Sequence, residues 1–199
     1  MIKRCILTAT AALALSACAD TPVATSSAED ATPALDVYAA RDSFYTTQTP
    51  ADVLDAAPGW EVGTRFITYV DGRITGFRFY KAPGECGSHT ARLWNESGQQ
   101  IASATFTNET ASGWQRVTTT AKFIPAGSYM VSVNTNCKQA KTFAWFTNNG
   151  EIDRGWGTAY GGAYGQPTGS MPGSNSGSSF FVDVYFRERI CEGPLGSCA

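Results

Sequence analysis

The sequence lacks features that mark three common classes of protein. It contains one histidine and no closely spaced Cys-x-x-Cys pair, which argues against a zinc centre. Its 17 acidic residues outnumber its 15 basic ones, so the charge gives no footprint for nucleic-acid binding. The apolar run from Cys5 to Ala17 has 13 residues, whereas a membrane-spanning helix needs about 20. We therefore reject a zinc protein, a nucleic-acid-binding protein and a membrane-spanning helix at this position.

The N-terminus is instead typical of an export signal. Two basic residues precede the apolar run and small residues follow it, as in a secretory signal peptide that is later removed. Residues 15–18 (LSAC) resemble a bacterial lipobox, which implies diacylglycerol on the Cys18 thiol, cleavage before Cys18 and acylation (for example by palmitate) of the new amino terminus. Ala19 at the next position resembles an outer-membrane sorting signal of Gram-negative bacteria. The alternative is an ordinary signal peptide in which Cys18 has no role.

The composition divides the chain into four expected segments. Residues 1–17 are the signal peptide, and residues 18–42 are the lipidated cysteine with a flexible tether rich in Ala, Thr, Ser and Pro. Residues 43–188 are the folded domain, and residues 189–199 are a tail closed by a disulfide. Cleavage leaves 182 residues with a net charge of −4, which is enough chain for one domain with a proper core.

The folded segment is expected to be all-β. Many stretches are rich in β-branched and aromatic residues and are separated by turn signals such as Asp71-Gly72. Irregular alternation near Gly76 predicts a β-bulge, and the Gly/Ser/Tyr-rich stretch 148–178 predicts a long loop. Short strands without a long amphipathic helix predict an antiparallel β-sandwich or jelly roll. The expected strands are 64–70, 73–80, 90–95, 99–107, 114–123, 127–135, 141–147 and 179–186.

Four further cysteines predict two disulfides, because an even number in an exported domain indicates pairing. Glycine and proline between Cys191 and Cys198 permit a tight turn, so we expect these two to pair with each other. Cys86 then pairs with Cys137, and this bridge would join two loops at strand ends.

Residues 60–117 together with 178–186 resemble a bacterial domain-of-unknown-function family, number 4082, and the resemblance extends over roughly 43–186. That family recurs in large cell-surface proteins beside cadherin-like and immunoglobulin-like modules, and in sugar-processing proteins. It implies a β-sandwich and, by analogy with similar jelly rolls, carbohydrate association, with no established catalytic residues. This chain departs from the family at Cys86, Cys137, Trp145-Phe146 and the stretch 150–178. The segments that carry the resemblance are GFRFYK (76–81), GSHT (87–90), LW (93–94), ATFTNET (104–110) and GWQ (113–115).

Aromatic residues near the expected loops form the candidate ligand site, because a flat ring suits the apolar face of a pyranose. The alternative for each ring is partial burial against the end of the sandwich. Trp94 and Trp114 lie in family-like strands and are expected in the core. His89 is a candidate ligand contact or general base, although a hydrogen bond that fixes its loop is the preferred interpretation. The candidate rings are Trp60, Trp145, Trp156, Tyr160 and Tyr164.

No catalytic residues are assigned, because the chain has no Gly-x-Ser-x-Gly elbow and most of its carboxylates lie in expected turns. We therefore do not expect an enzyme or a bound cofactor. Asp183 lies inside an apolar strand, where it would either ligate a structural calcium ion through oxygen or face solvent.

The sequence therefore predicts a lipid-anchored extracytoplasmic binding module that recognises a glycan or an envelope protein. We expect it in the outer membrane of a Gram-negative bacterium, on the periplasmic or the surface face. The alternative is a structural or assembly protein of the envelope, and a polysaccharide-processing enzyme is the third interpretation.

Overall fold

The computed structural model describes residues 37–40 and 42–190. The predictions for the signal peptide, for Cys18 and for the pair Cys191–Cys198 lie outside the described residues. Contacts divide the chain into residues 1–34 and 35–199, and the described residues all belong to the second unit. Within this described part, no helix is both long and apolar enough to cross a membrane.

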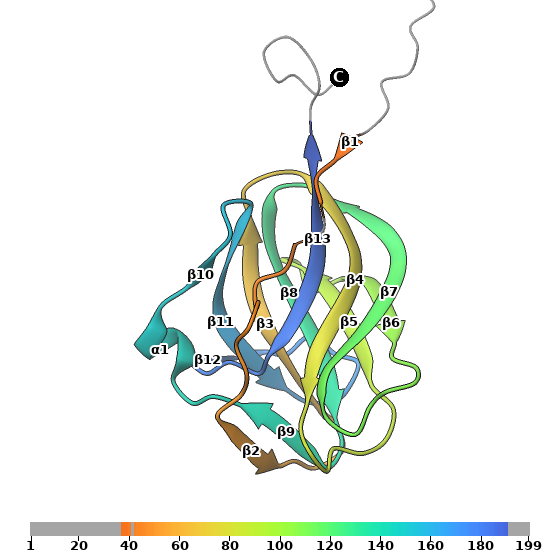
Figure 1. Cartoon of the computed structure of the whole chain (residues 1–199), viewed down its shortest axis with the longest axis vertical. Helices are drawn as coiled ribbons and strands as arrows, with labels where there is room; N and C mark the ends of the chain where they lie inside the picture. Colours follow the sequence, from red (N-terminus) through yellow and green to blue (C-terminus); the bar gives the residue numbers. More distant parts are fainter. Residues whose placement is uncertain (1–36, 41, 191–199) are drawn as a thin grey trace, which may run out of the picture. The chain divides into compact units, whose positions relative to one another are not determined.

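The described chain is an antiparallel β-sandwich, which confirms the predicted fold class (Figure 1). The first sheet has the strand order β1 (Val37–Tyr38), β13 (Val182–Ile190), β4 (Gly72–Lys81) and β7 (Gly113–Ile124). The second has the order β10 (Ile152–Asp153), β11 (Gly157–Gly165), β3 (Trp60–Thr68), β8 (Gly127–Thr135), β5 (Thr90–Asn95) and β6 (Gln100–Thr105). In addition, β12 (Ser174–Ser176) pairs with β11, and a small sheet joins β2 (Asp52–Asp55) to β9 (Lys138–Lys141).

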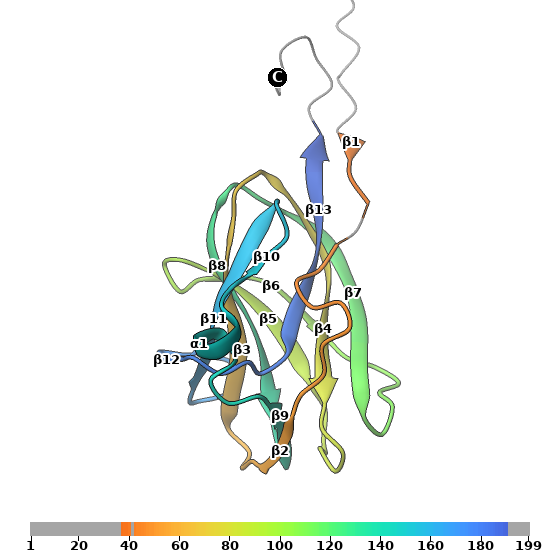
Figure 2. The same cartoon turned by 60° about the vertical axis from the view of Figure 1, so that its left-hand side comes forward.

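The two large sheets lie face to face (Figure 2). Alternation along their strands builds one core between them. Phe77, Val184 and Phe186 of the first sheet belong to the same buried cluster as Phe66 and Val131 of the second. Side chains on the inner face of each strand are buried away from water in this core. Each Å² of apolar surface that is buried contributes roughly 25 cal/mol of stabilisation. This shared core fixes the two sheets face to face.

The predicted bulge at Gly76 is confirmed. The register of β4 shifts between Ile74 and Gly76 against β7, and the register of β13 shifts opposite the same place, between Tyr185 and Phe186. A Cβ atom at Gly76 would lie 2.4 Å from the carbonyl oxygen of Val117, so the strand needs glycine at the bulge.

The predicted loop 148–178 is wrong, because β11 occupies its middle and pairs with β3. The glycines of this stretch let neighbouring backbones approach closely and do not serve to make the chain flexible. A Cβ atom at Gly157 would lie 2.5 Å from the Ile67 carbonyl oxygen, and one at Gly162 would lie 2.1 Å from that of Ser178. The composition resembles that of a loop, but glycine is required here because neighbouring backbones are in tight contact.

The expected strand 141–147 is also wrong. β9 ends at Lys141, and the short helix α1 (Trp145–Asn149) follows after Ala144, which has a left-handed backbone with φ of 49°. The strand pairing reaches Val37 on one side and Ile190 on the other, a few residues beyond the expected bounds of 43–188.

Candidate functional site

A cleft of about 440 Å³ lies where the inner face of the second sheet meets the small β2–β9 sheet. Its volume falls within the range of small-molecule sites in proteins, which is roughly 300–1,000 Å³. Aromatic, amide, hydroxyl and charged side chains share its wall. The lining residues are Asp55, Ala56, Ala57, Trp60, Val62, Thr135, Gln139, Lys141, Tyr164 and Phe180.

The strand register places two of the predicted rings together in this cleft. Tyr164 of β11 lies opposite Val62 of β3, and Trp60 is two residues before Val62, so both rings lie on one face of the sheet. Their ring centroids are 6.2 Å apart and their planes differ by 33°. Tyr164 keeps 38% of its surface exposed. The pair therefore offers an accessible aromatic platform.

Lys141, at the end of β9, supplies a positive charge to the cleft. Its Nζ lies 4.2 Å from the centroid of the Phe143 ring and 5.2 Å from that of Phe180. Burial lowers the pKa of Lys141 below its ordinary value, and the charge of Asp52 opposes this shift. Among the described residues, no carboxylate lies within ion-pair distance of Lys141. The ammonium group is therefore held mainly by aromatic faces.

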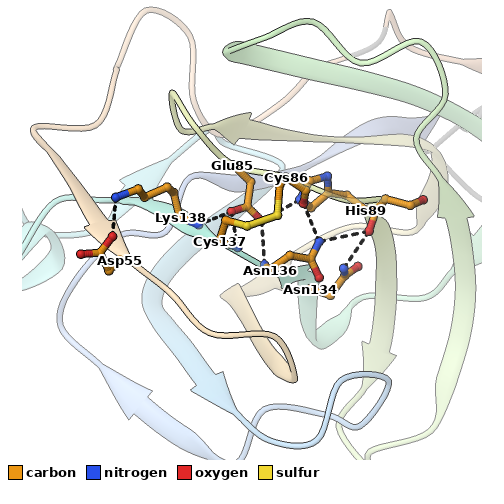
Figure 3. Close-up of a disulfide and its surroundings, with 9 residues drawn as sticks. Asp55, Glu85, Cys86, His89, Asn134, Asn136, Cys137 and Lys138 are labelled. Carbon is orange, nitrogen blue, oxygen red and sulfur yellow. Dashed lines mark hydrogen bonds and ion pairs between the residues drawn. A yellow bond between two sulfur atoms is a disulfide. The ribbon is translucent and has the colours of Figure 1, made fainter.

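The neighbouring charges on the rim neutralise each other. Lys138 donates a hydrogen bond to the carboxylate of Asp55 across the β2–β9 pair (Figure 3). The hydrogen bond from Lys138 and its positive charge hold the pKa of Asp55 below its ordinary value. Lys141 is thus the charged residue of the cleft wall that has no bonded counter-ion among the described residues, although the charge of Asp52 acts on it across the β2–β9 pair.

Glu85 fixes the turn that precedes β9. Its carboxylate accepts hydrogen bonds from the backbone N–H groups of Asn136 at 2.7 Å and Cys137 at 2.9 Å, and also from that of Lys138 (Figure 3). Burial alone would raise the pKa of Glu85, but the hydrogen bonds from His89 and from these N–H groups outweigh it and lower the pKa. The carboxylate thereby fixes the start of the strand that carries Lys141.

His89 is fully buried in the same network. Its Nε2 lies 2.8 Å from Glu85 Oε1, and its Nδ1 lies 2.8 Å from Glu109 Oε2. The Nζ of Lys81 lies 2.9 Å from the same oxygen of Glu109. Because both ring nitrogens are used inside the protein, the geometry favours the loop-fixing interpretation over a ligand contact or a general base.

The predicted pairing of Cys86 with Cys137 is confirmed. A disulfide joins the loop after β4 to the turn after β8, and the two Cα atoms are 5.5 Å apart (Figure 3). Since Cys137 is also bound by Glu85, the bridge and the carboxylate secure one and the same turn.

The other predicted rings do not line the cleft. Trp156 is a core residue, 7% exposed, and stacks on Phe186 with centroids 4.4 Å apart while its Nε1 donates to Asp42. Trp145 in α1 packs half-buried with its ring edge against Phe181. Tyr160 is exposed where the β11 register shifts, outside the cleft lining.

Asp183 is buried, so the solvent-facing alternative is wrong. It is fully buried and accepts hydrogen bonds from Arg78 at 3.0 Å and 2.8 Å and from the N–H groups of Phe44 and Tyr45. Burial raises its pKa, and the guanidinium of Arg78 opposes this shift. Protein donors already occupy both carboxylate oxygens. Within residues 37–40 and 42–190, no group of three or more His, Cys, Asp or Glu side chains could hold a metal ion.

The sequence patterns did not indicate several residues that line the cleft. Gln139 and Lys141 reach the cleft through the pairing of β9 with β2, a contact between segments far apart in the chain. Thr135 is buried, and its hydroxyl has no hydrogen-bond partner among the described residues. The one feature of the sequence that could have indicated a role for Lys141 is its position beside a run of aromatic residues.

A comparison with protein families matches most of the chain. A family model, described as a domain of unknown function (DUF4082), matches residues 36–182. No curated protein matches the chain.

Proposed function

Since this chain belongs to the DUF4082 family of domains of unknown function, we propose that it is a lipid-anchored binding module that holds a carbohydrate in the cleft of Trp60 and Tyr164. The single observation that carries this proposal is the presence of both rings in one accessible cleft. The anchor is the lipid expected on Cys18. The compartment is the outer membrane expected from the sorting signal.

The chemistry of the cleft wall supports a sugar as the ligand. Flat amphipathic rings present large contact surfaces at a low entropic cost, and they suit the apolar face of a pyranose. The amide of Gln139 lines the same cleft and can exchange hydrogen bonds with sugar hydroxyls. A few polar groups among apolar ones are the usual composition of a specific small-molecule site.

The support of β9 makes the cleft a preformed site. The disulfide and the carboxylate of Glu85 fix the turn from which β9 begins. A wall that is ordered before the ligand arrives saves the entropy of ordering it during binding, which favours affinity.

One observation favours a second function, assembly with an envelope protein. An open groove of about 610 Å³ follows the turn between β7 and β8, and its wall includes Phe123, which is 43% exposed, and Pro125. Exposed apolar surface of this kind is typical of protein contacts. A polysaccharide-processing enzyme receives no comparable support, because His89, Glu85 and Glu109 are engaged with one another.

A glycan-array screen of the purified full-length chain in detergent tests the carbohydrate proposal. Tyr164→Ala should weaken any hit about tenfold, which corresponds to about 1.4 kcal/mol. Tyr160→Ala is the matched control, because this tyrosine lies in the same strand with the same 38% exposure but outside the cleft. The control should bind like the wild type.

A blank array, or hits that survive Tyr164→Ala, would overturn the proposal. Cross-linking in cells, with Phe123→Ser as the variant expected to lose the partner, would then test the assembly function.

A further inference from the structure

We propose that the cleft selects sugars that carry an anionic group, and that Lys141 is the residue that binds this group. The inference rests on the proposed carbohydrate function and adds to it the class of sugar. Neutral glycans would bind the rings but would leave the ammonium group unmatched.

The first argument is the charge of the cleft wall. Asp55 and Lys141 are the charged residues among those that line it. Asp55 is paired with Lys138, so its charge is already offset. Asp52 lies opposite Lys141 in the β2–β9 register, yet it is not within ion-pair distance. A ligand in the cleft therefore meets an ammonium group on which the charge of Asp52 acts but to which no carboxylate of the described residues is bonded.

The second argument is the environment of that charge. Lys141 lies over the rings of Phe143 and Phe180 and is partly withdrawn from water. Partial burial of a charge without a bonded opposite partner carries a cost, and the aromatic faces and the charge of Asp52 offset part of that cost. An anionic group on the ligand would offset the rest, and its hydrogen bond to the ammonium would be charge-assisted.

The third argument is the position of Lys141 relative to the rings. The ammonium, the two rings and the polar side chains line one cleft rather than separate surfaces. A pyranose on Trp60 and Tyr164 would thus expose its ring substituents to Lys141 and Gln139. A carboxylate at C6, as in a hexuronate, or a sulfate ester provides the negative charge that Lys141 requires.

Isothermal titration of the full-length chain in detergent tests this inference with matched probes. The probes are oligomers of galacturonate, glucuronate and mannuronate, each as the free acid and as its methyl ester, and a sulfated oligosaccharide with its desulfated form. The esters keep the sugar ring and remove the charge. We expect at least one charged probe to bind ten or more times more tightly than its neutral form.

Lys141→Gln should abolish that preference by weakening the charged probe at least tenfold, while the neutral form changes less than twofold. Lys141→Met, which keeps the aliphatic stem, should behave in the same way and guards against a packing effect. Lys122→Gln is the matched control, because this exposed lysine of β7 lies outside the cleft. Its affinities should equal those of the wild type.

The outcomes separate the two proposals. Equal affinity for charged and neutral probes, or a preference that survives Lys141→Gln, would overturn the inference. If such binding were still lost in Tyr164→Ala, the carbohydrate function would stand. Glycan-array hits confined to neutral sugars would overturn the inference in the same way. The absence of any glycan binding would overturn both proposals.

Discussion

Removal of the Cys86–Cys137 disulfide should reduce the stability of the domain and leave its cleft intact. The bridge joins residues 51 positions apart. A cross-link over a loop of that length lowers the entropy of the unfolded chain by an amount worth about 4 kcal/mol at 25 °C. For a chain of this size, about 4 kcal/mol corresponds to a fall in Tm of roughly 8–16 °C. Because Glu85 still binds the turn at Cys137, the native geometry of β9 should persist.

The assay is urea unfolding of the double variant Cys86→Ser/Cys137→Ser at 25 °C, followed by tryptophan fluorescence. Substitution is better than a reductant here, since a reductant would also act on Cys191 and Cys198. Titration with the tightest glycan found should give an affinity within twofold of the wild type. A stability loss below about 1 kcal/mol would refute the entropic reasoning. A lost affinity in a folded variant would show that the bridge, rather than Glu85, holds the cleft wall.

Three further perturbations test other parts of the structure. Asp183→Asn should lower the free energy of unfolding in urea by about 3–5 kcal/mol, because it leaves the guanidinium of Arg78 buried without its counter-charge. The control Glu151→Gln, at an exposed position, should change this free energy by less than about 0.5 kcal/mol. An equally small change for Asp183→Asn would contradict the argument. The depressed pKa of Glu85 contributes stability in full above the unfolded pKa of about 4.3, and this contribution disappears as the pH falls through the lower folded value. The difference in unfolding free energy between wild type and Glu85→Gln should therefore shrink from pH 7 to about pH 3, and a constant difference would show that Glu85 acts without its charge. Cys18→Ser should release the protein from the membrane fraction of cells, whereas retention with an uncut leader would reject the lipidation.

Local sequence patterns predicted those parts of the fold in which the alternation within a single strand determines which of its side chains are buried. The alternation of Val182, Val184 and Phe186 indicates a strand with one buried face, and the structure places all three in the core. The broken alternation at Gly76 indicated the bulge, because one extra residue reverses the faces. The count of cysteines allowed three pairings, and Cys86–Cys137 was the pair that remained once Cys191 and Cys198 were expected to pair with each other.

Contacts between distant segments could not be predicted in this way. β11 is rich in glycine because neighbouring backbones approach it closely, and composition alone cannot tell this from a flexible loop. Asp183 pairs with Arg78 of another strand, so its burial is invisible in its own segment. The rings of Trp60 and Tyr164 were candidates, but the cleft exists only because β9 pairs with β2.

β1 and the cleft lie at opposite ends of the sandwich. Val37 pairs with Ile190 at the end of β13, beside the hairpin that follows Thr68, whereas Trp60 lies at the opposite end of β3 (Figure 1). The nine residues of β3 separate these two ends by about 27 Å. The sandwich therefore carries β1 and the cleft at opposite ends, and a ligand in the cleft would leave the pairing of β1 with β13 untouched.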